Sequence, residues 1–185
     1  MDDFKYLADL LHLFAFFILI WNMLKRQNCR GISYRTQELF LIVFVVRYLD
    51  IFVFPQRLWN VVLKLTFIGA TALCLYLIKY QNPISVSYDA IMDTFPSRTV
   101  LIPFCFIVGM FLPIPFEYAN WYLRLNNFTL VLEALAFLPQ LKILRKINEI
   151  EIITGSYIAC LGIYRFVYLC SWIWRLSLGE DTMHH

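Results

Sequence analysis

Arg47 and Asp50 interrupt the otherwise apolar stretch 40–54. An ionised side chain at the centre of a membrane helix costs roughly 2.5–3.5 kcal/mol on insertion scales, so its presence calls for a reason. The two residues lie three positions apart and share a face if the stretch is helical, where they can partly neutralise each other. One interpretation is an internal ion pair that only makes the helix insertable. The other is that Arg47 faces a polar cavity and binds an anion.

A histidine lies among charged residues in the first apolar stretch. Asp9 and His12 are three residues apart, and Lys5 precedes His12 by seven, so all three fall on one face of a helix. An imidazole changes its charge near pH 6.5, which makes His12 a natural switch between a neutral and a mildly acidic compartment. A structural histidine, hydrogen-bonded to Asp9 or to a neighbouring helix, fits the same pattern.

Two further charged residues, Glu133 and Arg165, are embedded in later apolar stretches. They could form an ion pair with each other, or either could contact a ligand. A cationic funnel suited to a peptide carboxylate could be formed by four residues from different helices: Lys5, His12, Arg47 and Arg165. An arginine binds a carboxylate with two parallel hydrogen bonds, which supports this reading. Lys64, in the third stretch, is expected to snorkel or to pair with Asp50 or Glu133.

Other kinds of site have no support in the sequence. It contains no nucleophile–base pair, metal-ligand cluster or glycine-rich phosphate loop, so we predict neither an enzyme nor a metal or cofactor site. The net charge of +3 is small and the basic residues fall in short clusters, which gives no support to nucleic-acid binding. The five cysteines lack metal-binding spacing and are interpreted as small apolar packing residues.

The composition is that of an integral membrane protein. The chain is 61% hydrophobic and 16% charged, whereas soluble domains are about 45–50% apolar and 25% charged. Six apolar stretches have the length of about 17–25 residues that a membrane-spanning helix needs. We therefore predict an all-α, polytopic membrane protein with one domain, 1–185, and six transmembrane helices near residues 6–24, 38–54, 58–80, 100–116, 121–141 and 152–174.

Prolines and basic residues set the limits and the orientation of these helices. Pro103 and two later prolines predict a short or kinked fourth helix, and Pro139 removes a backbone hydrogen bond near the end of the fifth. Lysines and arginines gather after the first, third and fifth helices. Because cytoplasmic loops carry an excess of these residues, the pattern predicts that these connectors are cytoplasmic and that the N-terminus is luminal.

Seven short segments carry a more specific signal. They lie in order along the chain at 4–12, 31–37, 47–50 (RYLD), 93–95, 138–141 (LPQL), 162–165 (GIYR) and 172–175 (WIWR). Together they resemble the KDEL receptor family, the ER lumen protein-retaining receptors. The resemblance implies a seven-helix fold similar to SWEET transporters, in which two triple-helix bundles of the PQ-loop type are joined by a linker helix.

The resemblance also implies a function. The family binds the C-terminal KDEL or HDEL signal of escaped luminal proteins in the acidic Golgi, returns them to the ER in retrograde vesicles and releases them at neutral pH. The implied location is the membrane of the ER and Golgi. The implied partners are luminal proteins that end in such a signal, the lipid bilayer and the vesicle coat machinery, with no nucleic acid.

Carried over by position, the resemblance assigns roles to individual residues. His12 matches the pH-sensing histidine, whose protonation is expected to strengthen binding. Asp50 and Glu133 match internal polar partners, and Asp9 joins them beside His12. The expected ligand-binding residues are Lys5, Arg47, Tyr164, Arg165, Trp172 and Arg175.

The sequence departs from the family pattern at several places. Leu123 and Asn126 stand where the family carries a glutamate and a tryptophan near the first residue of the signal, and Ser171 replaces an asparagine. The given sequence ends at His185, about one helix short of the family pattern, without the family's seventh helix and basic tail. Two alternatives therefore stand beside the receptor: a SWEET-like transporter of small solutes, and a truncated subunit that folds against a full-length partner without binding the signal.

Overall fold

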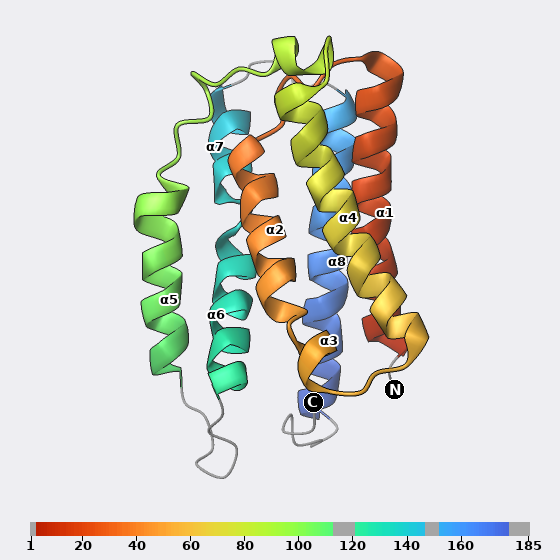
Figure 1. Cartoon of the computed structure of the whole chain (residues 1–185), viewed down its shortest axis with the longest axis vertical. Coiled ribbons are helices and arrows are strands. Elements are labelled where there is room, and N and C mark those ends of the chain that lie inside the picture. The colour runs from red at the N-terminus through yellow and green to blue at the C-terminus, as the bar shows by residue number, and fades with distance from the viewer. Residues whose placement is uncertain (1–2, 113–120, 147–151, 178–185) are drawn as a thin grey trace.

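The computed structural model describes residues 3–112, 121–146 and 152–177, and its secondary structure in these ranges is entirely helical (Figure 1). The three longest helices are α1 (Asp3–Arg26), α4 (Leu58–Tyr80) and α8 (Ile152–Ser177). The shorter elements are α2 (Tyr34–Arg47), α3 (Asp50–Val53), the 3₁₀ helix η1 (Ile84–Ser87), the π-helical turn η2 (Ser97–Leu101), α5 (Ile102–Phe111), α6 (Trp121–Leu135) and α7 (Leu138–Lys146).

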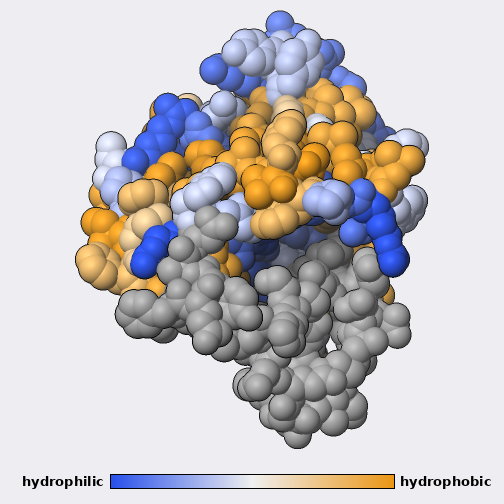
Figure 2. Space-filling model, turned by 60° about the horizontal axis from the view of Figure 1, so that its bottom comes forward, coloured by the Kyte–Doolittle hydropathy of each residue, from blue (hydrophilic) through white to orange (hydrophobic). Residues whose placement is uncertain are grey.

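The helices present many large apolar side chains outward, as expected of a protein surrounded by lipid. Trp21, Leu58 and Phe111 expose 67%, 79% and 84% of their surfaces, and Figure 2 shows hydrophobic residues in a broad band on the face that it displays. Among the described residues, two segments are long and apolar enough to span a membrane, Leu58–Tyr80 and Trp121–Lys146. The six spans expected from the sequence are therefore not established by this criterion.

The second expected helix, 38–54, is interrupted. Helix α2 ends at Arg47, a turn follows at Tyr48 and Leu49, and α3 begins at Asp50. In the turn, the amides of Leu49 and Ile51 bond to carbonyls three residues back instead of four. This tighter winding redirects the chain, so Arg47 and Asp50 do not share one continuous helical face.

The fifth expected helix, 121–141, is also divided. Helix α6 ends at Leu135, and α7 starts at Leu138 and continues to Lys146. Pro139 explains the break, because proline has no N–H to donate to the carbonyl of Leu135 and its ring would clash with that carbonyl. At the second position of α7, the missing donor costs nothing within that helix.

The fourth expected helix, 100–116, is short, in agreement with its prolines. Helix α5 has 10 residues, and Pro103 lies in its first turn, where proline is tolerated. Pro113 and Pro115 lie outside the described residues. Gly109 allows α5 to approach α6 closely, because a Cβ at this position would lie 2.5 Å from the Cα of Phe128.

Helices α1 and α2 form the centre of the molecule. Helix α1 packs against α8 and α4, whereas α2 packs against α4, α6 and α7, and α5 lies outside on α6 (Figure 1). The core between them is aromatic and aliphatic. Its largest fully buried side chains include Phe16, Phe40, Phe44, Tyr157 and Tyr164.

A buried polar network ties the segments together at the end of the molecule where α2 begins. Ser33 caps α2 by accepting a hydrogen bond from the amide of Thr36 (3.1 Å), and its hydroxyl donates to Asp93 (3.0 Å). Gln140 of α7 accepts from the amide of Ser33 (2.8 Å) and donates to the carbonyl of Gly31 (2.7 Å). Three segments distant in sequence are therefore fixed at one point.

The two ends of the helices differ in charge. The N-terminal end of α1 and the C-terminal end of α8 lie at the lower end in Figure 1, together with the turn after Arg47. The connector 27–33, the connector 81–96 and the end of α7 lie at the opposite end. That end carries the basic residues expected in alternate connectors, Lys25, Arg26, Arg30, Arg35, Lys79, Arg98, Lys142, Arg145 and Lys146.

Candidate functional site

Two arginines converge on one buried carboxylate between α2, α6 and α8. Arg47, the last residue of α2, forms an ion pair with Oε2 of Glu133 near the end of α6. Arg165, in the middle of α8, lies 3.4 Å from Oε1 of the same carboxylate and donates a hydrogen bond to the backbone carbonyl of Glu133 (2.5 Å). Arg47 also donates to the hydroxyl of Thr129 (3.3 Å). We call Arg47, Glu133 and Arg165 the arginine–glutamate cluster.

The cluster is positively charged and partly open. Its two guanidinium groups and single carboxylate carry a formal net charge of +1. The side chains of Arg47 and Arg165 are 25% and 36% exposed, whereas that of Glu133 is 10% exposed. Both arginine side chains are therefore more exposed than the carboxylate that they share. An anion with two oxygens, such as a second carboxylate, matches the hydrogen-bonding geometry of a guanidinium group.

His12 lies beside this cluster inside an aromatic cage. It is 4% exposed, and its ring stacks on Tyr164 with centroids 4.0 Å apart and planes 7° from parallel. The other rings around it are those of Phe16, Phe40, Phe44 and Phe67. The buried Nε2 atom of His12 has no hydrogen-bond partner among the described residues. Among the described residues, the charged groups near enough to act on His12 are Glu133, Arg165 and Arg47, the members of the arginine–glutamate cluster.

The expected partnership of Arg47 with Asp50 is replaced by two separate ion pairs. Asp50 binds Lys64 of α4, one of the two partners expected for that lysine, while Arg47 binds Glu133. Lys64 also donates to the side-chain oxygen of Gln56 (2.7 Å) and lies 5.6 Å from the ring centroid of Tyr48. The turn after Arg47 makes this possible because it directs Asp50 toward α4 and leaves Arg47 facing α6.

A small apolar cavity borders Arg165 on the side of α8. It has a volume of about 160 Å³ and lies next to the break between α6 and α7. A Cβ at Gly162 would meet no atom within 4 Å, so this part of α8 has space beside it. The cavity is lined by Phe40, Phe137, Ile158, Leu161, Gly162, Tyr164 and Arg165.

The structure brings together some of the residues predicted from the sequence and leaves others undescribed. His12, Arg47, Glu133, Tyr164 and Arg165 form one contiguous group, and Asp50 lies at its edge with Lys64. The backbone of α1 and α8 carries the remaining predicted residues, but their side chains lie outside the described part of the structure. These are Lys5, Asp9, Trp172 and Arg175.

Three contacts near the site were not anticipated from the sequence. Thr129, which accepts from Arg47, lies four residues before Glu133, so helical spacing places it on the face of Glu133 but does not identify Arg47 as its partner. The hydroxyl of Tyr122 donates a hydrogen bond to the backbone carbonyl of Arg47 (3.3 Å). The side-chain amide of Gln37 donates a hydrogen bond to the hydroxyl of Tyr157 (2.7 Å). Neither of these long-range contacts has a signal in the local sequence.

Comparison with known proteins identifies relatives along almost the whole chain. Residues 28–175 match the family model described as ER lumen protein retaining receptor. A Plasmodium falciparum protein named ER lumen protein-retaining receptor is 42% identical over 180 residues, which cover 97% of this chain and 80% of the relative. The protein of that name from Entamoeba histolytica is 37% identical, covering 96% and 80%. ER lumen protein-retaining receptor A of Arabidopsis thaliana is 34% identical, covering 95% and 80%. The chain therefore belongs to the ER lumen protein retaining receptor family.

Proposed function

We propose that this protein binds the C-terminal KDEL- or HDEL-type signal of luminal proteins in the acidic Golgi and returns those proteins to the ER. The arginine–glutamate cluster is the observation that carries the proposal, because it combines a net positive charge with two partly exposed arginine side chains. Family membership agrees with a receptor in the ER and Golgi membranes. The comparisons give no support to a solute transporter or to a subunit that does not bind the signal.

The C-terminal carboxylate of the signal is the group that the cluster would bind. Arg47 and Arg165 approach Glu133 from different helices, and each exposes a larger fraction of its side chain than Glu133 does. A ligand carboxylate on the exposed side would balance the excess charge of the two arginines. The apolar cavity of about 160 Å³ beside Arg165 offers a place for the side chain of the C-terminal leucine, which carries this carboxylate in both signals.

The same electrostatics couple ligand binding to pH through His12. Burial of the His12 ring opposes a positive charge on it, and the cluster beside it carries a formal net charge of +1 before the ligand binds. A bound carboxylate brings the net charge of the cluster and ligand to zero, so protonation of His12 becomes more favourable. By linkage, protonation of His12 strengthens ligand binding, and binding should weaken as the pH rises from the Golgi to the ER.

The proposed membrane arrangement has six spans and a luminal N-terminus. The concentration of lysine and arginine at the end that carries connectors 27–33 and 81–96 supports a cytoplasmic location for that end. The start of α1, the end of α8 and the turn after Arg47 then face the lumen. The packing of α1 and α2 against α4, with α5 on α6, is compatible with two triple-helix bundles of the PQ-loop or SWEET type in a single domain, 1–185.

Further residues complete the proposed site and its partners. We assign Tyr164 to the pocket wall because it contacts both His12 and Arg165. Lys5, Trp172 and Arg175 are proposed ligand contacts on the luminal parts of α1 and α8, and Asp9 is a proposed neighbour of His12. Vesicle coat machinery would be the cytoplasmic partner of a retrieval receptor.

Peptide binding at two pH values tests this function. A peptide ending in KDEL or HDEL should bind the purified protein more tightly at pH about 5.5 than at about 7.4. Arg47→Ala should abolish binding, because the ligand carboxylate loses a charge-assisted partner. Arg57→Ala is the matched control, because Arg57 is exposed at the same end of the molecule and outside the cluster. Absence of peptide binding at both pH values would refute the receptor function.

A further inference from the structure

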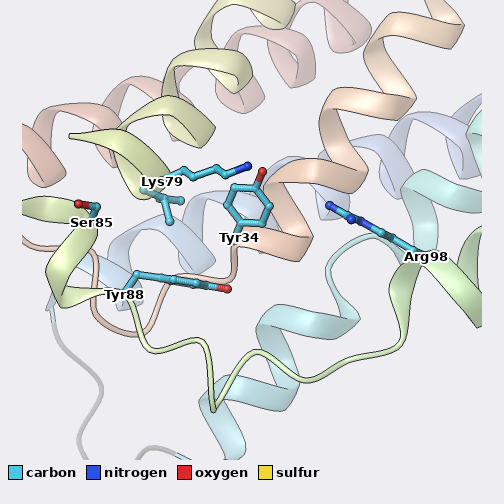
Figure 3. A pocket seen from close by; sticks show the side chains of 6 residues that line it. Tyr34, Lys79, Ser85, Tyr88 and Arg98 are labelled. Carbon is cyan, nitrogen blue, oxygen red and sulfur yellow. The ribbon is translucent and has the colours of Figure 1, made fainter. Parts of the chain in front are cut away.

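A polar groove lies at the end of the molecule where α2 begins, away from the arginine–glutamate cluster. It has a volume of about 250 Å³ and is formed where the connector 81–96 passes between the end of α4 and the start of α5 (Figure 3). Its residues come from α2, α4, the connector and η2, and we call it the connector groove. It is lined by Tyr34, Ile78, Lys79, Ser85, Tyr88 and Arg98.

Lys79 supplies a positive charge that no described carboxylate neutralises. Its ammonium group lies 5.3 Å from the ring centroid of Tyr80, and it has no ion-pair partner among the described residues. In Figure 3, the side chain of Lys79 reaches from α4 toward the same space as the hydroxyl of Tyr34. An exposed ammonium group without a described carboxylate partner is available to an anionic ligand.

Arg98 approaches the groove from the opposite side (Figure 3). Glu38 binds it through Nε and Nη2, and Nη1 has no acceptor among the residues that the structure describes. Glu38 orients this guanidinium group while leaving one nitrogen to face outward. The Arg98 side chain is 65% exposed, so a ligand can reach that nitrogen.

The hydroxyl groups of the groove add hydrogen-bonding capacity without negative charge. The hydroxyl of Tyr34 has no hydrogen-bond partner in the described part of the chain and lies between Lys79 and Arg98 (Figure 3). The hydroxyl of Tyr88 donates a hydrogen bond to the carboxylate of Asp93 (2.8 Å). Burial and the bond to Asp93 raise the pKa of Tyr88, so its phenol remains neutral. The groove thus combines two cations with neutral donors and acceptors.

The surroundings of the groove are apolar, as at a membrane surface. Val86 and Ile91 of the connector expose 80% and 85% of their surfaces, and Tyr76 and Tyr80 of α4 expose 52% and 63%. Tyrosines are enriched at the level of lipid headgroups, where their rings contact lipid and their hydroxyls contact water. The volume of about 250 Å³ is below the range of about 300–1,000 Å³ typical of drug-sized ligands, so it fits a headgroup and not a whole lipid.

We propose that the connector groove binds the phosphate monoester of a membrane phospholipid headgroup. A phosphate monoester carries a charge near −2 and three acceptor oxygens, which match cations and a hydroxyl that converge from different sides. The acyl chains of the lipid would lie against the exposed apolar side chains beside the groove. Because the ligand would contact α2, α4 and the connector together, its binding would hold these segments in one arrangement.

Binding of short-chain lipids to the purified full chain tests this proposal. The three probes are dioctanoyl phosphatidylinositol 4-phosphate, dioctanoyl phosphatidylinositol, which has only a phosphate diester, and the soluble inositol 1,4-bisphosphate. We expect the first probe to bind at least about tenfold more tightly than either of the others, as loss of a charge-assisted contact implies. Equal affinity for the monoester and diester lipids would overturn the proposed chemistry, and equal affinity for the soluble phosphate would overturn the lipid source.

Substitutions locate the site. Lys79→Gln should weaken binding of the phosphorylated lipid about tenfold, whereas Lys25→Gln, which changes an exposed lysine at the same end of the molecule, should change it less than about twofold. Tyr34→Phe removes only a hydroxyl and provides a second test if Lys79→Gln does not fold. The assignment would be overturned if Lys79→Gln and Lys25→Gln changed lipid affinity equally. If Lys79→Gln does not fold, wild-type lipid affinity in Tyr34→Phe would overturn it. Binding of the retention peptide reports on the opposite end and should be unchanged in all three variants.

Discussion

The imidazole ring of His12 lies flat on the phenol ring of Tyr164, with centroids 4.0 Å apart and planes 7° from parallel. The guanidinium carbon of the next residue, Arg165, lies 5.1 Å from the centroid of the same phenol ring. A single aromatic side chain therefore separates the titratable ring from an arginine of the arginine–glutamate cluster. The ring of Tyr164 therefore links the proposed pH switch to the proposed carboxylate site.

Replacing His12 should uncouple ligand binding from pH. In His12→Phe the ring stack on Tyr164 can persist, but the side chain cannot be protonated. We expect the affinities for a KDEL peptide at pH about 5.5 and about 7.4 to become nearly equal, and His12→Ala should have the same effect. Isothermal titration calorimetry at both pH values measures the ratio. Retention of the wild-type ratio in a folded His12→Phe protein would show that another group is the switch.

Neutralising Glu133 should destabilise the protein. Glu133→Gln leaves Arg47 and Arg165 without their shared carboxylate, and breaking a fully buried ion pair costs about 3–5 kcal/mol. We expect a smaller loss here, because the arginines are 25% and 36% exposed. The change in Tm in detergent measures it. Glu38→Gln is the control, since its partner Arg98 is 65% exposed and an ion pair on the surface adds little to stability. An equal decrease of Tm in both variants would contradict this account of the cluster.

The close approach of α5 to α6 predicts a steric effect at Gly109. In Gly109→Ala the new Cβ would lie 2.5 Å from the Cα of Phe128, so the two helices must move apart. Overpacking of this kind typically costs about 1–3 kcal/mol, and the Tm should fall accordingly. Gly162→Ala is the matched control, because its Cβ would meet nothing within 4 Å. If both variants unfold at the wild-type temperature, α5 and α6 are not packed as described.

Local patterns in the sequence predicted part of the fold. Apolar length located α1, α4 and α8 to within a few residues, because long apolar helices have a strong hydropathy signal. The same signal could not detect the interruption between Arg47 and Asp50, where all flanking residues are apolar or helix-compatible. Pro139 did indicate a lost backbone bond, but whether a proline kinks or divides a helix depends on its tertiary neighbours.

The site shows the same division between local and long-range information. The presence of Arg47, Glu133 and Arg165 within apolar sequence marked them as functional candidates, and the ion pair between Glu133 and Arg165 was among the expected possibilities. The sequence did not specify that Arg47 shares this carboxylate, while Asp50 binds Lys64. These partners come from different helices, and helical spacing carries no information about contacts between helices. The aromatic cage of His12 likewise depends on residues of α1, α2, α4 and α8.

Capture of the ligand's C-terminal carboxylate by the arginine–glutamate cluster is the central claim. The most direct measurement compares two KDEL peptides at pH about 5.5, one with a free C-terminal carboxylate and one with a C-terminal amide. The amide removes the negative charge and one acceptor oxygen while keeping every side chain. We expect the amide peptide to bind about 10- to 100-fold more weakly, as the loss of a charged hydrogen-bond partner implies. Equal affinity for the two peptides would contradict the claim.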